Sequence, residues 1–229
     1  MRSAAGDERK TLRLSIDEQG PNAFNRLRKF ERSLKEETLT RSFYERNTLT
    51  VAQDLLGKKL VRQLGSLKLT GWIVETEAYR GSDDPASHAY RGMTKRNAVM
   101  FKGPGLAYIY IAFGVNYCLN VTTERVGKAG AVLIRAIEPV DGIDSMIENR
   151  PSSQGNLVSL TSGPGKLCQA MKISTALNGT DLPDDGELTI HTSDWRPLEI
   201  EATRRIGISK ATRRLWRYHI KGNRFVSRA

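Results

Sequence analysis

Apolar and polar residues alternate along the middle of the chain in the pattern that is typical of β-strands. β-branched and aromatic residues fill the alternating runs, and turn residues such as Gly65-Ser66 separate them. The predicted strands span 59–62, 67–70, 72–78, 107–113, 117–121, 131–137, 187–191 and 216–220. Strands and helices do not alternate regularly, which argues against a parallel βαβ fold. The pattern predicts an α+β fold: a single domain with a curved, mainly antiparallel sheet flanked by helices.

Helical periodicity, with apolar residues three or four positions apart, appears on either side of these strands. The predicted helices span 24–34, 50–56, 142–148, 165–171 (with Ser162 as an alternative start) and 200–206. The second of them has Asn47 or Thr48 as a candidate N-cap and Gly57 as a stop signal. Residues 1–22 show weak periodicity, and we expect a mobile tail there.

Composition narrows the class of protein. The 229 residues are 39% hydrophobic and 27% charged, a balance that supports a folded core. No apolar run approaches the roughly 18 residues of a membrane span, and no secretory signal is evident. Cys118 and Cys168 are too few for a disulfide scaffold, so an intracellular protein with reduced thiols is expected.

Positive charge is concentrated near the C-terminus. The chain has 36 Lys and Arg against 25 Asp and Glu, a net charge of +11. Residues 196–229 alone hold ten basic and two acidic residues, and Trp216 and Phe225 lie among them. One interpretation is a solvated basic helix face. The other is a surface that grips phosphates, since a basic excess favours a polyanionic partner.

Two carboxylates, Glu75 and Glu77, lie on one face of an otherwise apolar predicted strand that leads into Tyr79. Burying them is costly unless they are paired or used. They fit a solvated edge, a pairing with arginines, or a base held next to an aromatic residue. Arg135 stands alone among the apolar residues of a second strand, where a guanidinium needs a ligand or an acidic partner. Glu75, Glu77 and Glu138 are the candidates for that partner.

Three further segments carry candidate chemistry. Phe113 comes at the end of a predicted strand, where an aromatic residue at a hairpin tip can act as a wedge between bases. His88 follows Asp83 and Asp84 in a turn-rich loop, but no metal-binding spacing supports a metal site. Residues 162–167 lack the spacing of a phosphate-binding P-loop, and a helix start that binds a single phosphate is the better interpretation.

Seven short motifs occur in order along residues 41–229. They are Val74–Tyr79, Ser87–Ala89, Arg96-Asn97 before Met100-Phe101, Gly105–Tyr110, Asn116–Val121, Val132–Pro139 and Gly163–Cys168. In these motifs the chain resembles the alkyladenine (3-methyladenine) DNA glycosylases of the mammalian type. The match is co-linear and has no large gaps, so it implies that residues 41–229 form a catalytic domain like theirs. Residues 1–40 lie outside the match, and we expect them to form an N-terminal extension, partly disordered or helical.

The resemblance implies a monofunctional DNA glycosylase of base excision repair. Such an enzyme flips alkylated or deaminated purines (the 3-methyladenine, 7-methylguanine and hypoxanthine class) out of duplex DNA and hydrolyses the N-glycosidic bond, leaving an abasic site. Glu77 would activate the attacking water, which Arg135 and the backbone carbonyl of Ile206 would help to hold. Phe113 stands where the family has an intercalating tyrosine. The base pocket would comprise Tyr79, His88, Tyr110 and Asn120, and DNA binding is assigned to Arg96, Lys166 and Lys221.

No cofactor and no metal are expected. The expected partner is double-stranded DNA containing damaged purines, bound by a monomer that does not associate with a membrane, in the cytoplasm and nucleoid or in the nucleus. The alternative is a non-enzymatic DNA- or RNA-binding protein that keeps the fold. Glu77 and Arg135 argue against this alternative, because a pure binder has no use for a carboxylate that faces phosphates.

Overall fold

The computed structural model describes residues 36–153, 155–195, 197 and 199–228. The tail predicted for residues 1–22 and the helix predicted for 24–34 lie outside these residues, as does nearly all of the predicted extension, 1–40. Glu37–Ala229 form one compact unit by their contacts, and the description below concerns this unit.

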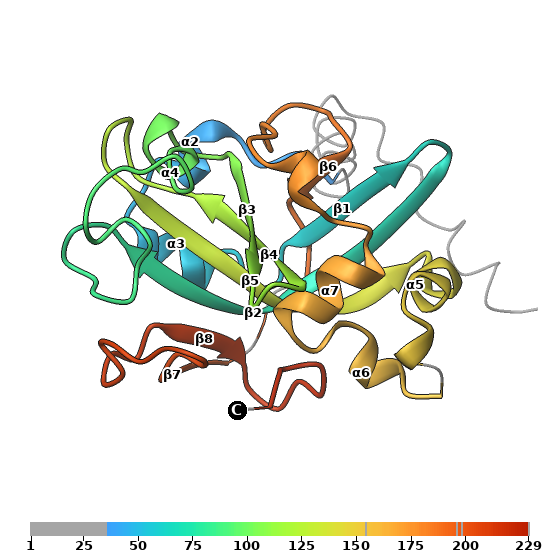
Figure 1. The fold of residues 1–229 in the computed structure, drawn as a ribbon. Helices are drawn as coiled ribbons and strands as arrows, with labels where there is room; N and C mark the ends of the chain where they lie inside the picture. The colour runs from blue at the N-terminus through green and yellow to red at the C-terminus, as the bar shows by residue number, and fades with distance from the viewer. Residues whose placement is uncertain (1–35, 154, 196, 198, 229) are drawn as a thin grey trace, which may run out of the picture. The chain divides into compact units, whose positions relative to one another are not determined.

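Eight strands form one sheet, and every strand pairing among the described residues is antiparallel (Figure 1). The strands are β1 (Lys59–Leu64), β2 (Leu67–Arg80), β3 (Ala107–Ala112), β4 (Asn116–Thr122), β5 (Gly130–Asp141), β6 (Leu188–His191), β7 (Ile200–Thr203) and β8 (Arg217–Ile220). Six of them follow the order β3-β4-β5-β2-β1-β6, and β8 joins β7 to β2. The curled antiparallel sheet, with several helices around it, confirms the predicted α+β fold.

The long strand β2 organises the sheet. Its residues pair with β5 along one edge, while β1 and then β8 share the other edge. Glu75 and Glu77 therefore lie in the middle of the sheet, between β5 and β8. Register shifts around Glu75 leave Val74 on β2 and Arg135 on β5 without a directly paired residue. Such bulges change the direction of side chains, and they are common next to functional sites.

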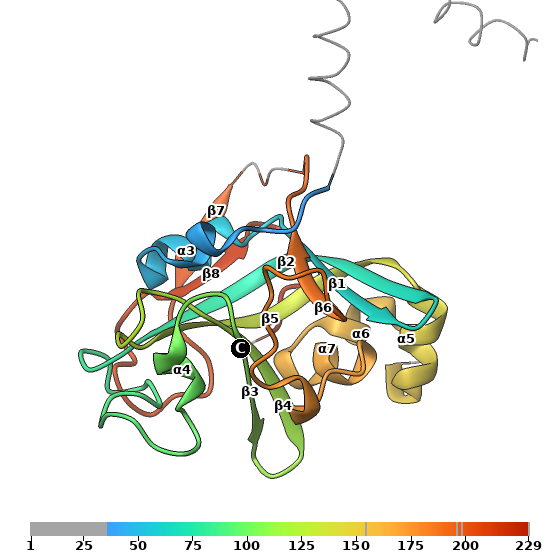
Figure 2. The same ribbon diagram turned by 90° about the horizontal axis from the view of Figure 1, so that it is seen from above.

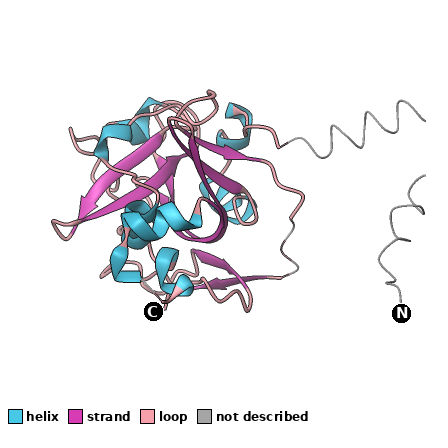
Figure 3. Ribbon diagram, turned by 90° about the vertical axis from the view of Figure 1, so that its right-hand side faces the viewer, coloured by secondary structure: helices cyan, strands magenta, loops and turns pink. Residues whose placement is uncertain are grey.

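Short helices surround the sheet (Figure 3). They are α2 (Arg41–Tyr44), α3 (Thr48–Asp54), α4 (Val99–Lys102), α5 (Ile143–Asn149), α6 (Leu157–Thr161), α7 (Pro164–Ala170) and the 3₁₀ turns η2 (Pro151–Ser153) and η3 (Thr175–Leu177). Asn47 caps α3, because its side chain accepts a hydrogen bond from the Leu49 N–H at 2.9 Å. Helix α3 packs on β2 and β5, and α7 packs on β4 and β5.

The helix predicted over 200–206 is wrong. Ile200–Thr203 form the strand β7, which pairs with β8 from Ile200 opposite Ile220 to Thr203 opposite Arg217. The segment is too short for its periodicity to separate a helix from a strand. The backbone hydrogen bonds that β8 offers decide in favour of the strand. Helices α2, α4 and α6 have only four or five residues each, and the sequence pattern did not reveal them.

The β3–β4 hairpin projects away from the neighbouring strands (Figure 2). Its tip, Phe113–Val115, turns back with the Val115 N–H donating to the Ala112 carbonyl at 3.3 Å. Phe113 has a φ of 51° and Gly114 a φ of 77°, the positive pair that a type I′ turn requires. Glycine adopts this conformation readily, whereas a phenylalanine there is strained.

A small apolar cluster supports the base of this hairpin, apart from the main core. It consists of Ala89, Val99, Met100, Tyr108, Ala129 and Ala131. The main core joins both ends of the described chain to the sheet, since Tyr44 of α2 and Phe225 are among its largest buried side chains. The smaller cluster fixes the aromatic face of β3, where the candidate site begins.

Candidate active site

A cavity of about 720 Å³ opens between the β3–β4–β5 part of the sheet and two loops, one around His88 and the other over residues 206–210. Eight of the residues that the sequence singled out line it: Tyr79, His88, Arg96, Tyr110, Phe113, Asn120, Arg135 and Ile206. Its size is in the range of small-molecule binding sites. The structure thus brings together residues that lie up to 127 positions apart in the sequence.

Aromatic side chains form one wall of this cavity. The ring centroids of His88 and Tyr110 lie 4.6 Å apart with an interplanar angle of 73°, an edge-to-face contact. His88 Nδ1 also lies 2.9 Å from the hydroxyl of Tyr108, which packs against Tyr110 at 5.5 Å. Tyr108 was not among the predicted site residues, although strand alternation already placed it on the same face as Tyr110.

The aromatic wall is uncharged near neutral pH. Burial raises the pKa of Tyr108 to about 12, and burial also raises the pKa of Tyr110. Burial and then the nearby Arg96 guanidinium lower the pKa of His88 from its usual 6.5. A neutral aromatic wall of this kind suits an aromatic or cationic ring.

Asn97 holds the loop that carries His88. Its side chain is 1% exposed. The Nδ2 donates to the carbonyls of His88 at 2.8 Å and Gly92 at 3.0 Å, and the Oδ1 accepts from the Thr94 N–H at 2.6 Å. The backbone next to the His88 side chain is therefore fixed before any ligand arrives.

Asn120 lines the cavity from β4, opposite Tyr108 in the register. Its Nδ2 donates to the carbonyls of Tyr108 at 3.0 Å and Cys118 at 3.2 Å. These two bonds orient the amide group, so its position in the cavity wall is set by the strand pair.

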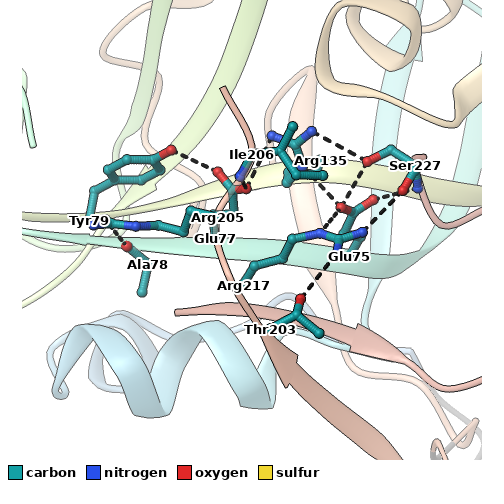
Figure 4. A network of polar contacts seen from close by, with 10 residues as sticks. All are labelled: Glu75, Glu77, Ala78, Tyr79, Arg135, Thr203, Arg205, Ile206, Arg217 and Ser227. Atoms are coloured by element: carbon teal, nitrogen blue, oxygen red, sulfur yellow. Dashed lines mark hydrogen bonds and ion pairs between the residues drawn. The ribbon is translucent and has the colours of Figure 1, made fainter. Parts of the chain in front are cut away.

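The Glu77 carboxylate is fully buried. Figure 4 shows it among Tyr79, Ile206 and Arg135. The Tyr79 hydroxyl donates to its Oε2 at 2.7 Å, and the Ile206 N–H donates to its Oε1 at 2.7 Å. Arg135 Nη1 lies 3.3 Å from the same Oε1. All three partners line the cavity, so the carboxylate lies next to the cavity wall. For Ile206, the contact in the structure is made by its N–H; the expected role of its carbonyl stays a prediction.

Glu75 lies on the same side of β2 but in a different environment. Its Oε1 accepts from Arg135 Nε at 3.0 Å, Arg217 Nε at 2.6 Å and the Ser227 hydroxyl at 2.8 Å. Its Oε2 accepts from the Ser227 N–H at 2.7 Å. Both carboxylates are fully buried, so the interpretation of a solvated strand edge is wrong and the pairing with arginine is correct.

Arg135 joins the two carboxylates. Burial disfavours its charge, but Glu77 and then Glu75 outweigh burial and raise its pKa. Of the three acidic partners that the sequence offered, Glu75 and Glu77 contact it. Glu138 instead accepts from the Asn223 side chain at 2.7 Å.

A second buried ion pair, between Arg205 and Asp84, holds the loop before Ile206. The two Nη atoms of Arg205 donate to the two carboxylate oxygens of Asp84 at 2.6 and 2.8 Å, and Nη1 also donates to the Ala78 carbonyl at 2.9 Å. The guanidinium lies 4.7 Å from the Tyr79 ring centroid. No local signal in the sequence indicated this pair, because its members are 121 residues apart.

Phe113 lies at the rim of the cavity and is 90% exposed. Val115 beside it is 78% exposed, so the hairpin tip is an apolar projection. The Phe113 side chain buries almost no apolar surface when the chain folds, although its backbone is strained. Strained backbone positions and exposed apolar projections are found at functional sites.

The basic residues differ in whether they line the cavity and in whether an acidic residue pairs with them. Arg96 lies at the cavity, 5.3 Å from the Tyr110 ring centroid. Lys166 on α7 and Lys221 lie outside the cavity lining, and Lys221 pairs with Glu199 at 2.7 Å. In the C-terminal run, Arg205 and Arg217 are buried and paired with Asp84 and Glu75.

The described part of this C-terminal run, 197 and 199–228, contains strands and turns but no helix. The interpretation of a basic helix face is therefore wrong. Within the described residues, no group of three or more His, Cys, Asp or Glu side chains is placed to hold a metal ion. The helices of the described residues are all too short or too polar to cross a membrane.

Comparison with known proteins connects this geometry to a family. The model of the methylpurine-DNA glycosylase family matches residues 42–224. A relative from Alkaliphilus oremlandii, named "Putative 3-methyladenine DNA glycosylase", is 46% identical over 200 residues, which cover 83% of this chain and 98% of the relative. Relatives of the same name are 48% identical over 193 residues in Prosthecochloris aestuarii (82% and 90% covered) and Methanocella arvoryzae (83% and 96% covered).

Proposed function

The chain belongs to the methylpurine-DNA glycosylase family and is a monofunctional DNA glycosylase of base excision repair, and we propose that it excises alkylated and deaminated purines. The proposed substrates are the 3-methyladenine, 7-methylguanine and hypoxanthine class. The proposed nucleophile is a water that Glu77 activates. The observation that carries the proposal is the position of the Glu77 carboxylate, which is buried at the back of an aromatic cavity and contacts three of its lining residues.

The cavity supports binding of a flipped purine. A base cannot be reached inside a duplex, so it must leave the stack before its glycosidic bond is attacked. We propose that it enters between Tyr79, Tyr110 and His88, whose neutral rings favour an electron-poor alkylated base. The oriented Asn120 side chain narrows the same cavity and is proposed to exclude unmodified guanine.

The contacts of Glu77 support its role as a general base. Its Oε1 already accepts from Ile206 and faces Arg135, whereas Oε2 accepts one hydrogen bond among the described residues, from Tyr79. A carboxylate oxygen has two lone pairs, so Oε2 can accept a proton from water as well. The water oxygen then bonds to the sugar C1′ and its proton passes to Glu77. The C1′–N bond breaks with its electron pair leaving on the purine, which leaves an abasic site.

The hairpin tip supports the flipping step. Phe113 is proposed to enter the space that the extruded nucleotide vacates, as an apolar wedge. Arg96 at the cavity and Lys166 and Lys221 away from it are proposed to contact the DNA backbone. The proposed partner is double-stranded DNA with damaged purines, bound by a monomer wherever the cell keeps its DNA.

The test is base release from end-labelled duplexes that each hold one hypoxanthine, 7-methylguanine or 3-methyladenine, followed by alkaline cleavage of the abasic product. Under single-turnover conditions, the wild-type protein is expected to cleave the damaged strand. Glu77→Gln is expected to lower the rate by about 10²- to 10⁴-fold, the usual contribution of a general base. Glu148→Gln, at an exposed position of α5, is the matched control and should react as the wild type.

A wild-type protein that binds these duplexes without releasing any base would favour the alternative of a non-enzymatic binder. Base release that persists at the wild-type rate in Glu77→Gln would remove Glu77 from the proposed mechanism while leaving the glycosylase activity in place.

A further inference from the structure

The guanidinium of Arg135 has three partners that together fix its plane. Its Nε donates to Glu75 at 3.0 Å, its Nη1 faces Glu77 at 3.3 Å, and its Nη2 donates to the Ser227 hydroxyl at 3.3 Å (Figure 4). A guanidinium is a rigid planar fork. Losing one of the three contacts therefore allows it to turn about the other two.

Ser227 contacts both Arg135 and Glu75. An isolated Arg–carboxylate pair prefers a bidentate geometry, with two nitrogens on the two oxygens of one carboxylate. The Ser227 N–H occupies Oε2 of Glu75 at 2.7 Å, and its hydroxyl donates to Oε1 at 2.8 Å. Arg135 contacts Glu75 through Nε on Oε1, and its Nη1 is directed towards Glu77.

The segment that carries Ser227 is itself held firmly. Ser227 is 7% exposed, and Phe225 two residues before it is 2% exposed in the main core. Arg217 Nη2 donates to the Ser227 carbonyl at 3.0 Å, while its Nε binds Glu75. The hydroxyl therefore has a fixed position, donating to Glu75 and accepting from Arg135.

We propose that Ser227 is a positioning residue of the excision reaction: its hydroxyl keeps Arg135 Nη1 directed at Glu77. This inference rests on the proposed function, since it acts through Glu77 and Arg135. Ser227 itself is not among the residues that line the cavity. Its contribution belongs to the chemical step, and binding of damaged DNA does not depend on it.

The test compares Ser227→Ala, which removes the hydroxyl but keeps the backbone N–H, with Ser227→Thr, which restores a hydroxyl. The single-turnover rate of hypoxanthine release is expected to fall about 10-fold in Ser227→Ala, the typical effect of losing a hydrogen bond to a charged group. Ser227→Thr is expected to recover most of the rate. The Kd for the damaged duplex should stay within about 2-fold in both variants.

A double-mutant cycle separates positioning from mere structure. Because Ser227 acts through Glu77, Ser227→Ala should lower the rate no further in a Glu77→Gln background. Ser153→Ala is the control, since Ser153 is also buried and its hydroxyl also donates a hydrogen bond, to the Arg150 carbonyl at 2.8 Å. It should change the melting temperature without changing the rate of the folded enzyme. Should Ser227→Ala fail to fold, Ser227→Cys gives the same comparison with a weaker donor.

The outcomes are distinguishable. A wild-type protein that releases no damaged base would overturn the proposed function and this inference with it. An active wild type and a Ser227→Ala variant of equal rate would overturn the inference alone. The same holds if Ser227→Ala lowers the rate equally with and without Glu77, or if its whole effect is a weaker Kd.

Discussion

The carboxylate cluster (Glu75, Glu77, Arg135, Arg217 and Ser227) and the hairpin tip (Phe113–Val115) are opposite kinds of environment. Both carboxylates are fully buried, and their oxygens accept hydrogen bonds from the chain. The hairpin tip is apolar and exposed, and the backbone of Phe113 has a positive φ, which is strained for a bulky residue. The side chains of the first region are held by polar contacts within the fold, whereas those of the second are exposed to solvent.

The difference indicates which region serves each step of the proposed reaction, the excision of the base and the flipping of the nucleotide. Electrostatic groups that act on a transition state work best when they are already oriented, since no reorganisation is needed during the reaction. The hairpin tip is proposed to act as a wedge, whose partner would be the DNA stack and not the protein. The cluster should therefore respond to substitution in stability and rate, and the tip in DNA binding.

The largest expected effect comes from Glu75. Glu75→Gln leaves Arg135 and Arg217 buried without their shared carboxylate, so the free energy of unfolding should fall by about 3–5 kcal/mol. The free energy of unfolding should fall less in Glu77→Gln, because Arg135 keeps its ion pair with Glu75. Urea unfolding followed by tryptophan fluorescence measures both. Equal losses in the two variants would contradict the division between a structural and a reactive carboxylate.

Phe113→Ala should leave the free energy of unfolding within about 0.5 kcal/mol of the wild type, because the side chain is 90% exposed. The binding free energy of this variant for a damaged duplex should weaken by about 1–3 kcal/mol, the value of one aromatic–base contact. Fluorescence anisotropy with a Glu77→Gln background measures the affinity without turnover. An unchanged Kd would show that the tip does not contact the stack.

The smallest effect is expected at His88, in the cavity wall between the two regions. Its pKa is lowered from 6.5 by burial and by Arg96, so the unfolded chain takes up a proton before the folded one as the pH falls. This residue should therefore contribute a loss of stability that begins near pH 6.5 and ends below the folded pKa. NMR titration of the His88 ring checks the pKa, with His88→Gln for assignment. A pKa above 6.5 would contradict the neutral wall.

The sequence predicted the fold better than the connections within the site. Alternating residues were sufficient for the strands around Glu77 and Arg135, and the family resemblance was sufficient to select these two residues. The Ile200–Thr203 strand was missed because a four-residue segment takes its structure from the neighbouring β8. Ser227 had no local signal at all, since its role depends on a side chain 92 residues earlier, Arg135.

The sequence also did not reveal which charges of the C-terminal run are buried. Counting residues treated Arg205 and Arg217 as surface cations, whereas both are buried and neutralised inside the protein. Their partners, Asp84 and Glu75, lie far away in the sequence. Composition reports the sum of charges, and only the fold decides which of them reach the solvent.

The contacts of the carboxylate cluster also indicate when during folding the proposed site forms. The contacts of Glu75 with Arg135, Arg217 and Ser227 close loops of 60, 142 and 152 residues. The contact of Glu77 with Ile206 closes one of 129 residues. Long loops are closed late, because their entropy is lost before many contacts repay it. A half-folded chain thus lacks the assembled carboxylate cluster, and the proposed hydrolytic centre is complete only when the whole domain has closed.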